Sequence, residues 1–349
     1  MAEFAFVRVE GTPYEMGYQH GTQCRETIRY LAGEGLFKEI ARVGKADPVS
    51  IRNGAREYEP HIKSAAPHLI EEIRGIADGA RIDYEEALIL QCRSELVYRA
   101  KMNAECTSFA IARERSSGGE VIVGQNLDLA SSFEEFGIIL CLYPREGPAV
   151  MTWTLAGTLG QVGLNSGGLA RCGNVLMCPG WRVGLPTTVL FRRILEQETV
   201  AGVEALIGSI YRAKSNAFVV GDRSGRVAAI ETTVDEHRLL EPENGVVMHS
   251  NHYVHEDFLQ QERFYDVPDS VVRLSRLRDL FGSHAAPLTV EDLKSFLRDH
   301  ATEPNTICRH ERTPGGVKTV VSVVSRPERG VMEVCRGNPC GGEYVEYRL

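Results

Sequence analysis

The chain has 349 residues, of which 43% are hydrophobic and 25% are charged, a composition typical of soluble globular proteins and unlike that of disordered or fibrous chains. Its formal net charge is -8, and its lysines and arginines are scattered without a basic run, which argues against nucleic acid as a partner. No apolar stretch is long enough to span a membrane, and the start of the chain lacks a basic segment followed by an apolar one. We therefore expect a soluble, cytoplasmic protein without a membrane partner.

Residues 1–105 are predicted to be rich in helix after one short strand. Thr12 is followed directly by proline and, three residues on, by glutamate, which is typical of an N-cap and first helical turn. This pattern predicts a helix over about 13–32. Further helices are predicted from Pro67 and after Asp83, where a glutamate three residues on resembles a capping box.

Residues 106–349 show a different local pattern, in which short β-rich runs are separated by Gly-containing turns. The first five runs predict an antiparallel meander. Predicted strands cover 107–112, 121–125, 138–143, 150–155, 169–175, 216–221, 227–232, 246–250, 318–324 and 331–336. Predicted helices cover 185–197, 201–212, 269–281 and 289–298. Blocks of strands separated by helix pairs indicate sheets covered by helices, which is a layered α+β fold.

The boundary between these two parts carries the most informative residue. Cys106, one of nine cysteines, begins the β-rich part directly after the helical segment, which is predicted to end near Asn103. A thiolate is a strong nucleophile, but attack on an amide also requires a base. A cysteine that begins a chain supplies that base itself, because its α-amine has a pKa of about 7.7–8.0 and can take the thiol proton.

Further motifs accompany Cys106 in order along the chain. They are Gly11–Gly21, Glu72–Ala80, Arg93-Ser94-Glu95, Gly124-Gln125-Asn126-Leu127-Asp128, Val162–Gly168, His249-Ser250-Asn251-His252 and Thr306-Ile307-Cys308-Arg309. Together with the position of the cysteine, they resemble the acyl-coenzyme A:6-aminopenicillanic acid acyltransferase family, which is the C45 peptidase family of the Ntn hydrolases. The resemblance extends from residue 11 to residue 309, which makes coincidence a poor explanation.

The resemblance implies a four-layer αββα Ntn-hydrolase sandwich that forms one catalytic domain. It also implies a zymogen that is cleaved autocatalytically between Glu105 and Cys106. Residues 1–105 would be the α subunit or propeptide and residues 106–349 the β subunit, and the two fragments would stay associated. The family's best-known member has glycine where this chain has Glu105, and glycine adopts a strained backbone at lower steric cost. Cleavage is therefore a prediction separate from catalysis.

The catalytic roles that the resemblance implies fall on four residues. Cys106 would be the nucleophile, and Asp128 would orient its α-amine or a nearby cation. Asn251 would donate to the tetrahedral oxyanion, and Arg309 would hold an acidic group or the substrate.

Other roles concern processing and substrate binding. Glu105 and Cys106 flank the predicted cleavage site, and Ser108 matches a hydroxyl position associated with self-processing. Three polar residues are predicted to contact the substrate, namely Asn126, Asn174 and His252.

The predicted function is that of an amidohydrolase or acyltransferase acting on a linear amide C–N bond through a Cys106 thioester. Transfer to water gives hydrolysis, and transfer to an amine gives a new amide. The expected partner is a small-molecule amide or acyl donor; no cofactor is expected, and acyl-coenzyme A would enter only as a substrate. Two alternatives remain open, an uncleaved Cys–His hydrolase and a non-catalytic ligand-binding protein with the same fold. The sequence indicates no oligomeric state.

Two patterns contain metal-ligating residue types, and both are interpreted as structural. Val246, Val247 and Met248 lead into His249, His252 and His255 as a predicted strand, and an extended backbone would splay the three rings apart. Cys335 and Cys340 lack the paired spacing of a zinc ribbon. No metal site is predicted.

Overall fold

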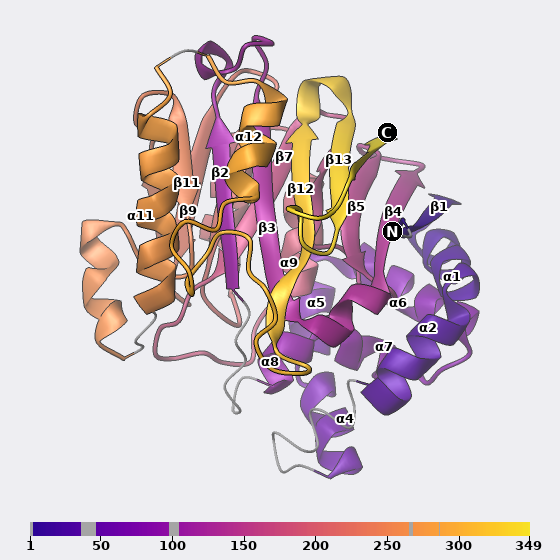
Figure 1. Cartoon of the computed structure of the whole chain (residues 1–349). Coiled ribbons are helices and arrows are strands. Elements are labelled where there is room, and N and C mark those ends of the chain that lie inside the picture. Colours follow the sequence, from indigo (N-terminus) through magenta and orange to yellow (C-terminus); the bar gives the residue numbers. More distant parts are fainter. Residues whose placement is uncertain (1–2, 36–46, 98–104, 265–267, 286) are drawn as a thin grey trace.

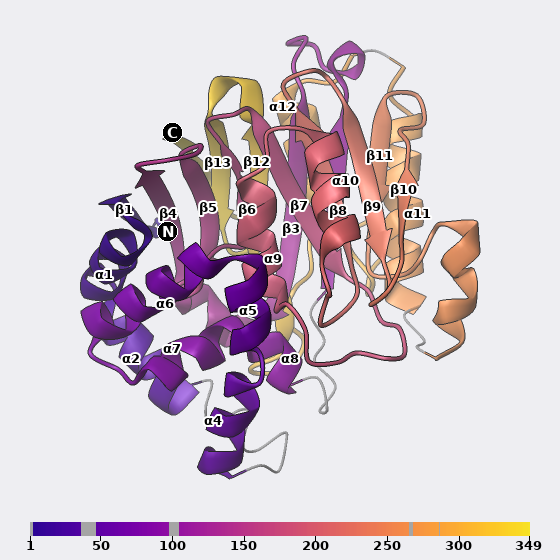
Figure 2. The same cartoon turned by 180° about the vertical axis from the view of Figure 1, so that it is seen from behind.

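Two β-sheets lie face to face in this protein, and helices cover both outer faces (Figure 1 and Figure 2). The computed structural model describes residues 3–35, 47–97, 105–264, 268–285 and 287–349. The predicted end of the helical part near Asn103 lies outside the described residues. The layers confirm the predicted α+β fold with an αββα arrangement.

The strands divide into a sheet of eight and a sheet of six. The larger sheet runs in the order β1 (Ala5–Gly11), β4 (Gly137–Pro144), β5 (Val150–Leu155), β6 (Val162–Asn165), β7 (Leu169–Val175), β8 (Asn216–Asp222), β9 (Val227–Thr232) and β10 (His237–Leu240). The smaller sheet runs in the order β11 (Val246–His249), β2 (Glu105–Ile111), β3 (Ile122–Ala130), β12 (Val317–Arg326), β13 (Val331–Arg336) and β14 (Tyr344–Arg348). Strands β1 and β4 pair in parallel.

The helices form three groups. The first group precedes β2 and consists of α1 (Pro13–Gln23), α2 (Arg25–Tyr30), α4 (Pro48–Arg56), α5 (Glu59–Ala65), α6 (Pro67–Ala80), α7 (Tyr84–Gln91) and α8 (Arg93–Val97). The pair α9 (Thr187–Leu195) and α10 (Val200–Ser209) covers the eight-stranded sheet (Figure 2). The pair α11 (Pro268–Gly282) and α12 (Val290–Leu297) covers the six-stranded sheet (Figure 1). Short helical turns lie at Leu31–Gly35, Arg113–Arg115, Ser131–Phe136, Glu256–Phe264 and Pro327–Arg329.

The helix starts follow the local signals in the sequence. Thr12 caps α1 and forms a capping box with Glu15, and Asp83 caps α7 in the same way. The helix predicted over 13–32 is instead two helices, because Cys24 leaves the helical backbone (φ -107°, ψ 18°). Apolar periodicity continues across this position, so it does not reveal an interruption of one residue.

The predicted antiparallel meander is wrong in one respect, since its strands do not share one sheet. Strands β2 and β3 belong to the six-stranded sheet, whereas β4, β5 and β7 belong to the other. The turn Ser131–Phe136 carries the chain from one sheet to the other. Strands that pair side by side and strands that stack face to face show the same local pattern, so the sequence did not distinguish them. The short strands β6, β10 and β14 were not predicted.

Helices α1 and α6 cross in close contact because glycines face each other. A Cβ atom on Gly17 would lie 2.0 Å from the Glu72 carbonyl oxygen, and one on Gly75 would lie 2.2 Å from the Tyr14 carbonyl oxygen. Real Cβ contacts of this length do not occur, so larger side chains would force the helices apart. These glycines belong to two of the motifs that carried the family resemblance.

Strand β2 is positioned between two layers. One of its faces packs against β7 and β8 of the larger sheet, and α11 packs against it from the other side. Its position places the beginning of β2 at the interface between the sheets. Every helix in the described part of the chain is too short or too polar to cross a bilayer.

Candidate active site

Cys106 lies near the start of β2, with its side chain between the two sheets. It pairs with Leu127 on β3, so both side chains point to the same face of the six-stranded sheet. Only 2% of Cys106 is exposed. It lines a cavity whose empty volume is about 860 Å³ when the open solvent at its mouth is included. The predicted nucleophile is therefore shielded from bulk solvent but borders this cavity.

The cavity is mainly apolar but contains three buried or half-buried basic residues. Its apolar wall comes from both sheets and from α9, and consists of Leu127, Leu129, Val162, Val175, Met177, Trp181 and Phe191. The basic residues are Arg93, Arg171 and Lys214. Arg93 and Ser94 belong to the Arg-Ser-Glu motif that preceded the predicted cleavage site.

Side chains from distant segments hold the backbone of Cys106. Its N–H donates to Asn251 Oδ1 at 2.7 Å. Its carbonyl oxygen accepts from Asn174 Nδ2 at 2.9 Å and from Arg273 Nη1 at 2.6 Å. The described structure thus fixes both polar backbone groups of this residue through side chains, which restricts how the thiol can move.

The amide of Asn251 has a definite orientation. Its Oδ1 atom accepts from Cys106 N and from Arg273 Nη2, the latter at 3.0 Å, while its Nδ2 atom donates to the Val175 carbonyl oxygen at 3.1 Å. Two donors at one atom require that atom to be the oxygen. In the uncleaved chain Asn251 therefore presents an acceptor to the nucleophile's nitrogen, whereas the family resemblance implied a donor to the oxyanion.

The Cys106 thiol is neutral at neutral pH in the uncleaved chain. Burial raises its pKa to about 12, the Asp128 carboxylate adds to the rise, and Arg273 opposes it. A thiol in this state is a weak nucleophile. It requires a base in its immediate surroundings.

Asp128 lies on the opposite face of the sheet from the thiol. It pairs with Glu105, and its Oδ1 atom accepts from Thr319 Oγ1 at 2.7 Å. Its Oδ2 atom is buried without a hydrogen-bond partner among the described residues. Burial raises the pKa of Asp128 to about 7, although Arg273 and the Thr319 hydroxyl both lower it. A carboxylate with one unused oxygen next to the predicted cleavage site can accept from a new cation there.

The raised pKa of Asp128 predicts a pH-dependent stability. The folded chain binds this proton more tightly than the unfolded chain does, since the pKa rises from 3.8 to about 7. Below pH 3.8 the carboxyl is protonated in both states, so Asp128 does not reduce the unfolding free energy. As the pH rises from 3.8 to about 7, the unfolding free energy falls progressively, by up to about 4 kcal/mol. Asp128→Asn, made in an uncleaved Cys106→Ala chain, is expected to gain stability relative to its parent as the pH rises from about 4 to about 7. Urea unfolding at a series of pH values measures this, and parallel profiles for the two chains would contradict it.

Arg309 contacts the residue that precedes the nucleophile. Its Nη1 atom forms an ion pair with Glu105 Oε2 and lies 3.0 Å from Asp269 Oδ2. Arg273 joins the same cluster, with its Nη2 atom 3.4 Å from Glu105 Oε2. In the intact chain Arg309 thus holds the Glu105 side chain, and the role that the resemblance implied for it stays a prediction.

The remaining predicted residues surround the site without lining the cavity. Ser108 donates to Asn174 Oδ1, which links it to the carbonyl of Cys106 through that asparagine. Asn126 donates to the carbonyl oxygens of Leu297 and Ile307, at 2.8 and 2.9 Å. His252 binds the hydroxyls of Ser250 and Ser270. The described cavity wall includes none of Asn126, Asn174 and His252. These three side chains instead hold neighbouring segments through the hydrogen bonds given above.

Comparison with known proteins identifies the family. A model of the acyl-coenzyme A:6-aminopenicillanic acid acyl-transferase family matches residues 115–340. The chain belongs to this family. The matched region contains Asp128, Asn251 and Arg309 and begins after Cys106. The resemblance predicted from the motifs is confirmed.

Individual relatives of this family member share 27% or less of their residues with it in the comparisons that follow. The acyl-coenzyme A:6-aminopenicillanic-acid-acyltransferase 40 kDa form of Emericella nidulans is 27% identical over 308 residues, which cover 87% of this chain and 84% of the relative. Among solved structures, a variant of the conjugated bile acid hydrolase from Clostridium perfringens has a TM-score of 0.45 at 13% identity and covers 69% of this chain and 97% of its own. Penicillin V acylase from Agrobacterium tumefaciens has a TM-score of 0.44 at 14% identity and covers 66% of this chain and 83% of its own.

Arg273 is the site residue of this family member that the sequence did not reveal. It is fully buried on α11 and contacts the carbonyl oxygen of Cys106, Thr107 Oγ1 at 2.8 Å and Asn251. The available signal was weak, namely one arginine among the apolar residues of a predicted helix. Cys106 and Thr107 lie more than one hundred and sixty residues before Arg273 in the chain, and Asn251 lies 22 residues before it, so no local pattern connects them.

His249, two residues before Asn251, is already engaged. His249 is fully buried, with Nε2 2.7 Å from Glu231 Oε1 and Nδ1 2.7 Å from the Ser250 carbonyl oxygen. Within the described residues, the contacts between a histidine ring nitrogen and a cysteine sulfur are those of His310 with Cys308 and Cys340. The predicted alternative of a Cys–His hydrolase would therefore have to use that pair, which lies outside the cavity wall.

Proposed function

We propose that this chain is a cysteine amidohydrolase or acyltransferase of the Ntn type, with Cys106 as its nucleophile after cleavage of the Glu105–Cys106 bond. The observation that carries this proposal is the setting of Cys106. Its thiol lies in a cavity wall, and its backbone nitrogen and carbonyl are both bound by side chains from other segments. A purely structural cysteine requires neither feature.

Cleavage follows from attack by the thiol on the neighbouring carbonyl. The Cys106 sulfur adds to the carbonyl carbon of Glu105, the C–N bond breaks as the nitrogen takes a proton, and Glu105 remains as a thioester on the sulfur. Water then hydrolyses the thioester, which restores the thiol and leaves a free α-amine on Cys106. The ion pairs of Glu105 with Arg309 and Arg273 support this step because they hold the residue whose carbonyl is attacked.

The same sulfur then acts on substrate. The α-amine takes the thiol proton, the thiolate attacks the amide carbonyl of the substrate, and the amine product leaves with a proton from the ammonium group. The acyl group remains as a thioester until water or an acceptor amine removes it. Asn251 Oδ1 already accepts from the nitrogen that becomes the amine, and Asp128 Oδ2 offers a second acceptor nearby. The contact with Asn251 and the unused acceptor on Asp128 both support the α-amine as the base.

The cavity favours an acyl donor that combines an apolar chain with an anionic group. Lys214 is 4% exposed and Arg171 is 1% exposed, and neither forms an ion pair with a described residue. Burial lowers the pKa of both side chains, that of Arg171 to about 10. Arg171 donates to the Gln161 carbonyl oxygen and stacks on the Phe191 ring, and Lys214 lies over the Trp181 ring, so each cation is partly compensated without an anion. A substrate carboxylate would supply the missing anion. Acyl-coenzyme A thioesters remain possible donors for the same cysteine.

Lys214→Met is expected to reduce the preference for anionic substrates. We expect its kcat/KM to fall about 10–100-fold on an amide whose acyl chain ends in a carboxylate, because a charged hydrogen bond is lost. The kcat/KM for the methyl ester of that acyl chain is expected to change little. Lys318→Met is the control, since Lys318 pairs with Glu134 outside the cavity. Equal losses on both substrates would contradict an anion-binding role for Lys214.

Trapping the acyl-enzyme tests the proposed function. Purified protein is incubated with hexanoyl and adipoyl p-nitroanilides and with the corresponding N-acetylcysteamine thioesters, and intact mass is recorded. The fragment that begins at Cys106 is expected to gain the acyl mass, which hydroxylamine should remove. Nitroaniline release that persists without Cys106 would favour the Cys–His alternative. Binding without adduct or turnover would favour the ligand-binding alternative.

A further inference from the structure

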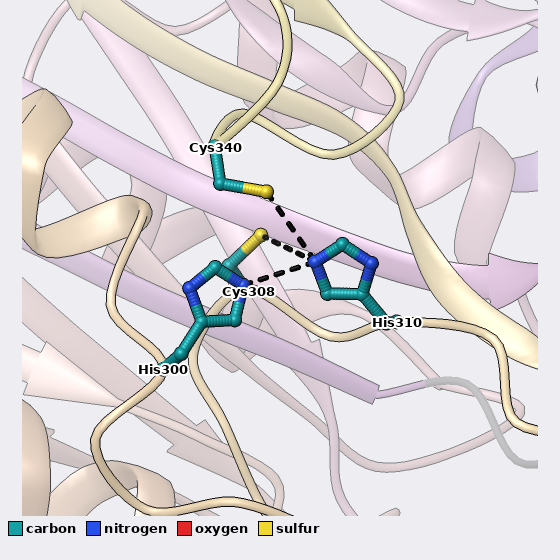
Figure 3. Close-up of side chains that lie close together, drawn as sticks. All are labelled: His300, Cys308, His310 and Cys340. Carbon is teal, nitrogen blue, oxygen red and sulfur yellow. Dashed lines mark hydrogen bonds between the residues drawn. The ribbon is translucent and has the colours of Figure 1, made fainter.

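Four metal-ligating side chains converge at the surface beyond the end of α12. They are His300, Cys308, His310 and Cys340, and their ligand atoms all lie within 4.8 Å of one another (Figure 3). Three of the side chains, those of His300, Cys308 and His310, come from the connection between α12 and β12, and that of Cys340 comes from the segment after β13. Cys308 is buried, whereas the other three are exposed.

The contacts around His310 are better explained by a shared centre than by hydrogen bonds. Its Nε2 atom lies 3.0 Å from His300 Nε2, 3.3 Å from Cys340 Sγ and 4.0 Å from Cys308 Sγ. One ring nitrogen forms a single directed hydrogen bond, either as donor or as acceptor. Three polar atoms around it, all aimed inward in Figure 3, therefore remain unexplained without a further group between them.

The spacing suits a tetrahedral zinc ion. Zinc–nitrogen bonds of about 2.0–2.1 Å and zinc–sulfur bonds of about 2.3 Å place two nitrogens about 3.3 Å apart and a nitrogen and a sulfur about 3.6 Å apart. The observed nitrogen–sulfur separations of 3.3 and 4.0 Å bracket the expected value, and the observed nitrogen–nitrogen separation of 3.0 Å is about 0.3 Å shorter than expected. Two sulfurs and two imidazoles also form a donor set that zinc prefers over calcium or magnesium.

We propose that His300, Cys308, His310 and Cys340 form a structural zinc site. Four protein ligands complete the tetrahedron, so the ion has no open position for substrate, which is typical of a structural rather than a catalytic centre. The cavity with Cys106 is lined by other residues. The metal is therefore not assigned a role in the acyl-transfer chemistry.

Neighbouring groups support the ligands. Asn338 Nδ2 lies 3.5 Å from Cys308 Sγ and donates to the Arg309 carbonyl oxygen at 2.7 Å. The backbone N–H of Cys308 donates to the Asp299 carbonyl oxygen at 3.1 Å. Such contacts orient a ligand and stabilise the charge on a thiolate.

The site would fasten a loop that reaches the proposed cleavage junction. Arg309 stands between two of the ligands in sequence and forms the ion pair with Glu105. A zinc ion that joins Cys308 and His310 to Cys340 would tie this loop to the segment after β13. Its structural effect would thus be to fix the backbone that presents Arg309.

Metal analysis of the reduced full-length protein tests this proposal. Protein expressed with added zinc and purified without chelator is expected to contain about one zinc per chain by mass spectrometry of the metal. Cobalt(II) exchange is expected to give the visible bands of a tetrahedral site and a thiolate charge-transfer band. The same zinc content is expected in Cys106→Ala, so the result is independent of cleavage and activity.

Matched variants identify the ligands. Cys340→Ser and His300→Ala are expected to lower the zinc content to below about one fifth of the wild-type value and to abolish the cobalt bands. Cys335→Ser and His284→Ala, which change the same residue types outside the cluster, are expected to retain both. The proposal is overturned if the reduced wild type binds neither metal or if all variants bind equally.

Discussion

Cys106→Ala is expected to abolish both cleavage and acyl transfer. The 38.6 kDa wild-type chain should divide into fragments of about 12 and about 27 kDa, at about 0.11 kDa per residue, whereas the variant should remain whole. Removing the sulfur removes the atom that attacks in both reactions, so acyl transfer should fall by about 10⁴-fold or more. Intact-mass spectrometry measures the cleavage, and nitroaniline release measures the transfer.

Cys172→Ala is the matched control for this experiment. Cys172 is a fully buried thiol on β7, between Arg171 and Gly173, which both line the cavity, yet Cys172 itself does not line it. Its variant is expected to cleave and turn over like wild type. If wild-type protein stays whole as well, cleavage is absent or needs another factor, and the α-amine loses its place as the base. The Cys–His and ligand-binding alternatives would then gain weight.

Asn251 is expected to act through its oxygen rather than its nitrogen. Asn251→Ala removes the acceptor for Cys106 N and for Arg273, and we expect a loss of about 10²–10³-fold in the acylation rate, which is the size seen when one donor or acceptor is removed from such a site. Asn251→Asp keeps an acceptor at the same place and pairs with Arg273. Its loss is expected to be less than about tenfold. Single-turnover acylation, followed by intact mass, measures both rates.

The two Asn251 variants also separate the possible roles. An oxyanion donor would be lost in both, and a carboxylate would repel the developing negative charge, so Asn251→Asp would then be as slow as Asn251→Ala or slower. That outcome would contradict the acceptor role. Thermal unfolding of both variants checks that the fold is retained, since Asn251 also donates to the Val175 carbonyl oxygen.

Local signals in the sequence determined most of the elements of this fold. Thr12 and Asp83 mark helix starts because a capping side chain needs only the backbone of the next turn. Strands such as β5 and β13 were predicted at their observed bounds, since alternation and flanking turns are also properties of short segments. The sheet to which each strand belongs was not predicted, because that depends on partners far along the chain.

Some residues of the candidate site were likewise predicted from the sequence, and others were found only in the structure. The sequence by itself indicated Cys106, since a cysteine at the change from helix to strand needs no distant partner to be noticed, and the ordered motifs supplied Asp128, Asn251 and Arg309. Only the tertiary structure placed Arg273 on the carbonyl of Cys106, turned the Asn251 oxygen toward its nitrogen and buried Lys214 in the cavity wall.

The proposed zinc site is the clearest example of a feature that the sequence did not predict. His300, Cys308, His310 and Cys340 lie in segments whose spacing matches no common metal motif, and the sequence predicted no metal site. Folding brings their ligand atoms within 4.8 Å because β12 and β13 return the chain beside the loop that bears Arg309. The type of a side chain, which the sequence gives directly, determines whether it can be a nucleophile or a metal ligand. Which side chains lie close together depends on the chain topology, and neighbouring residues do not reveal it.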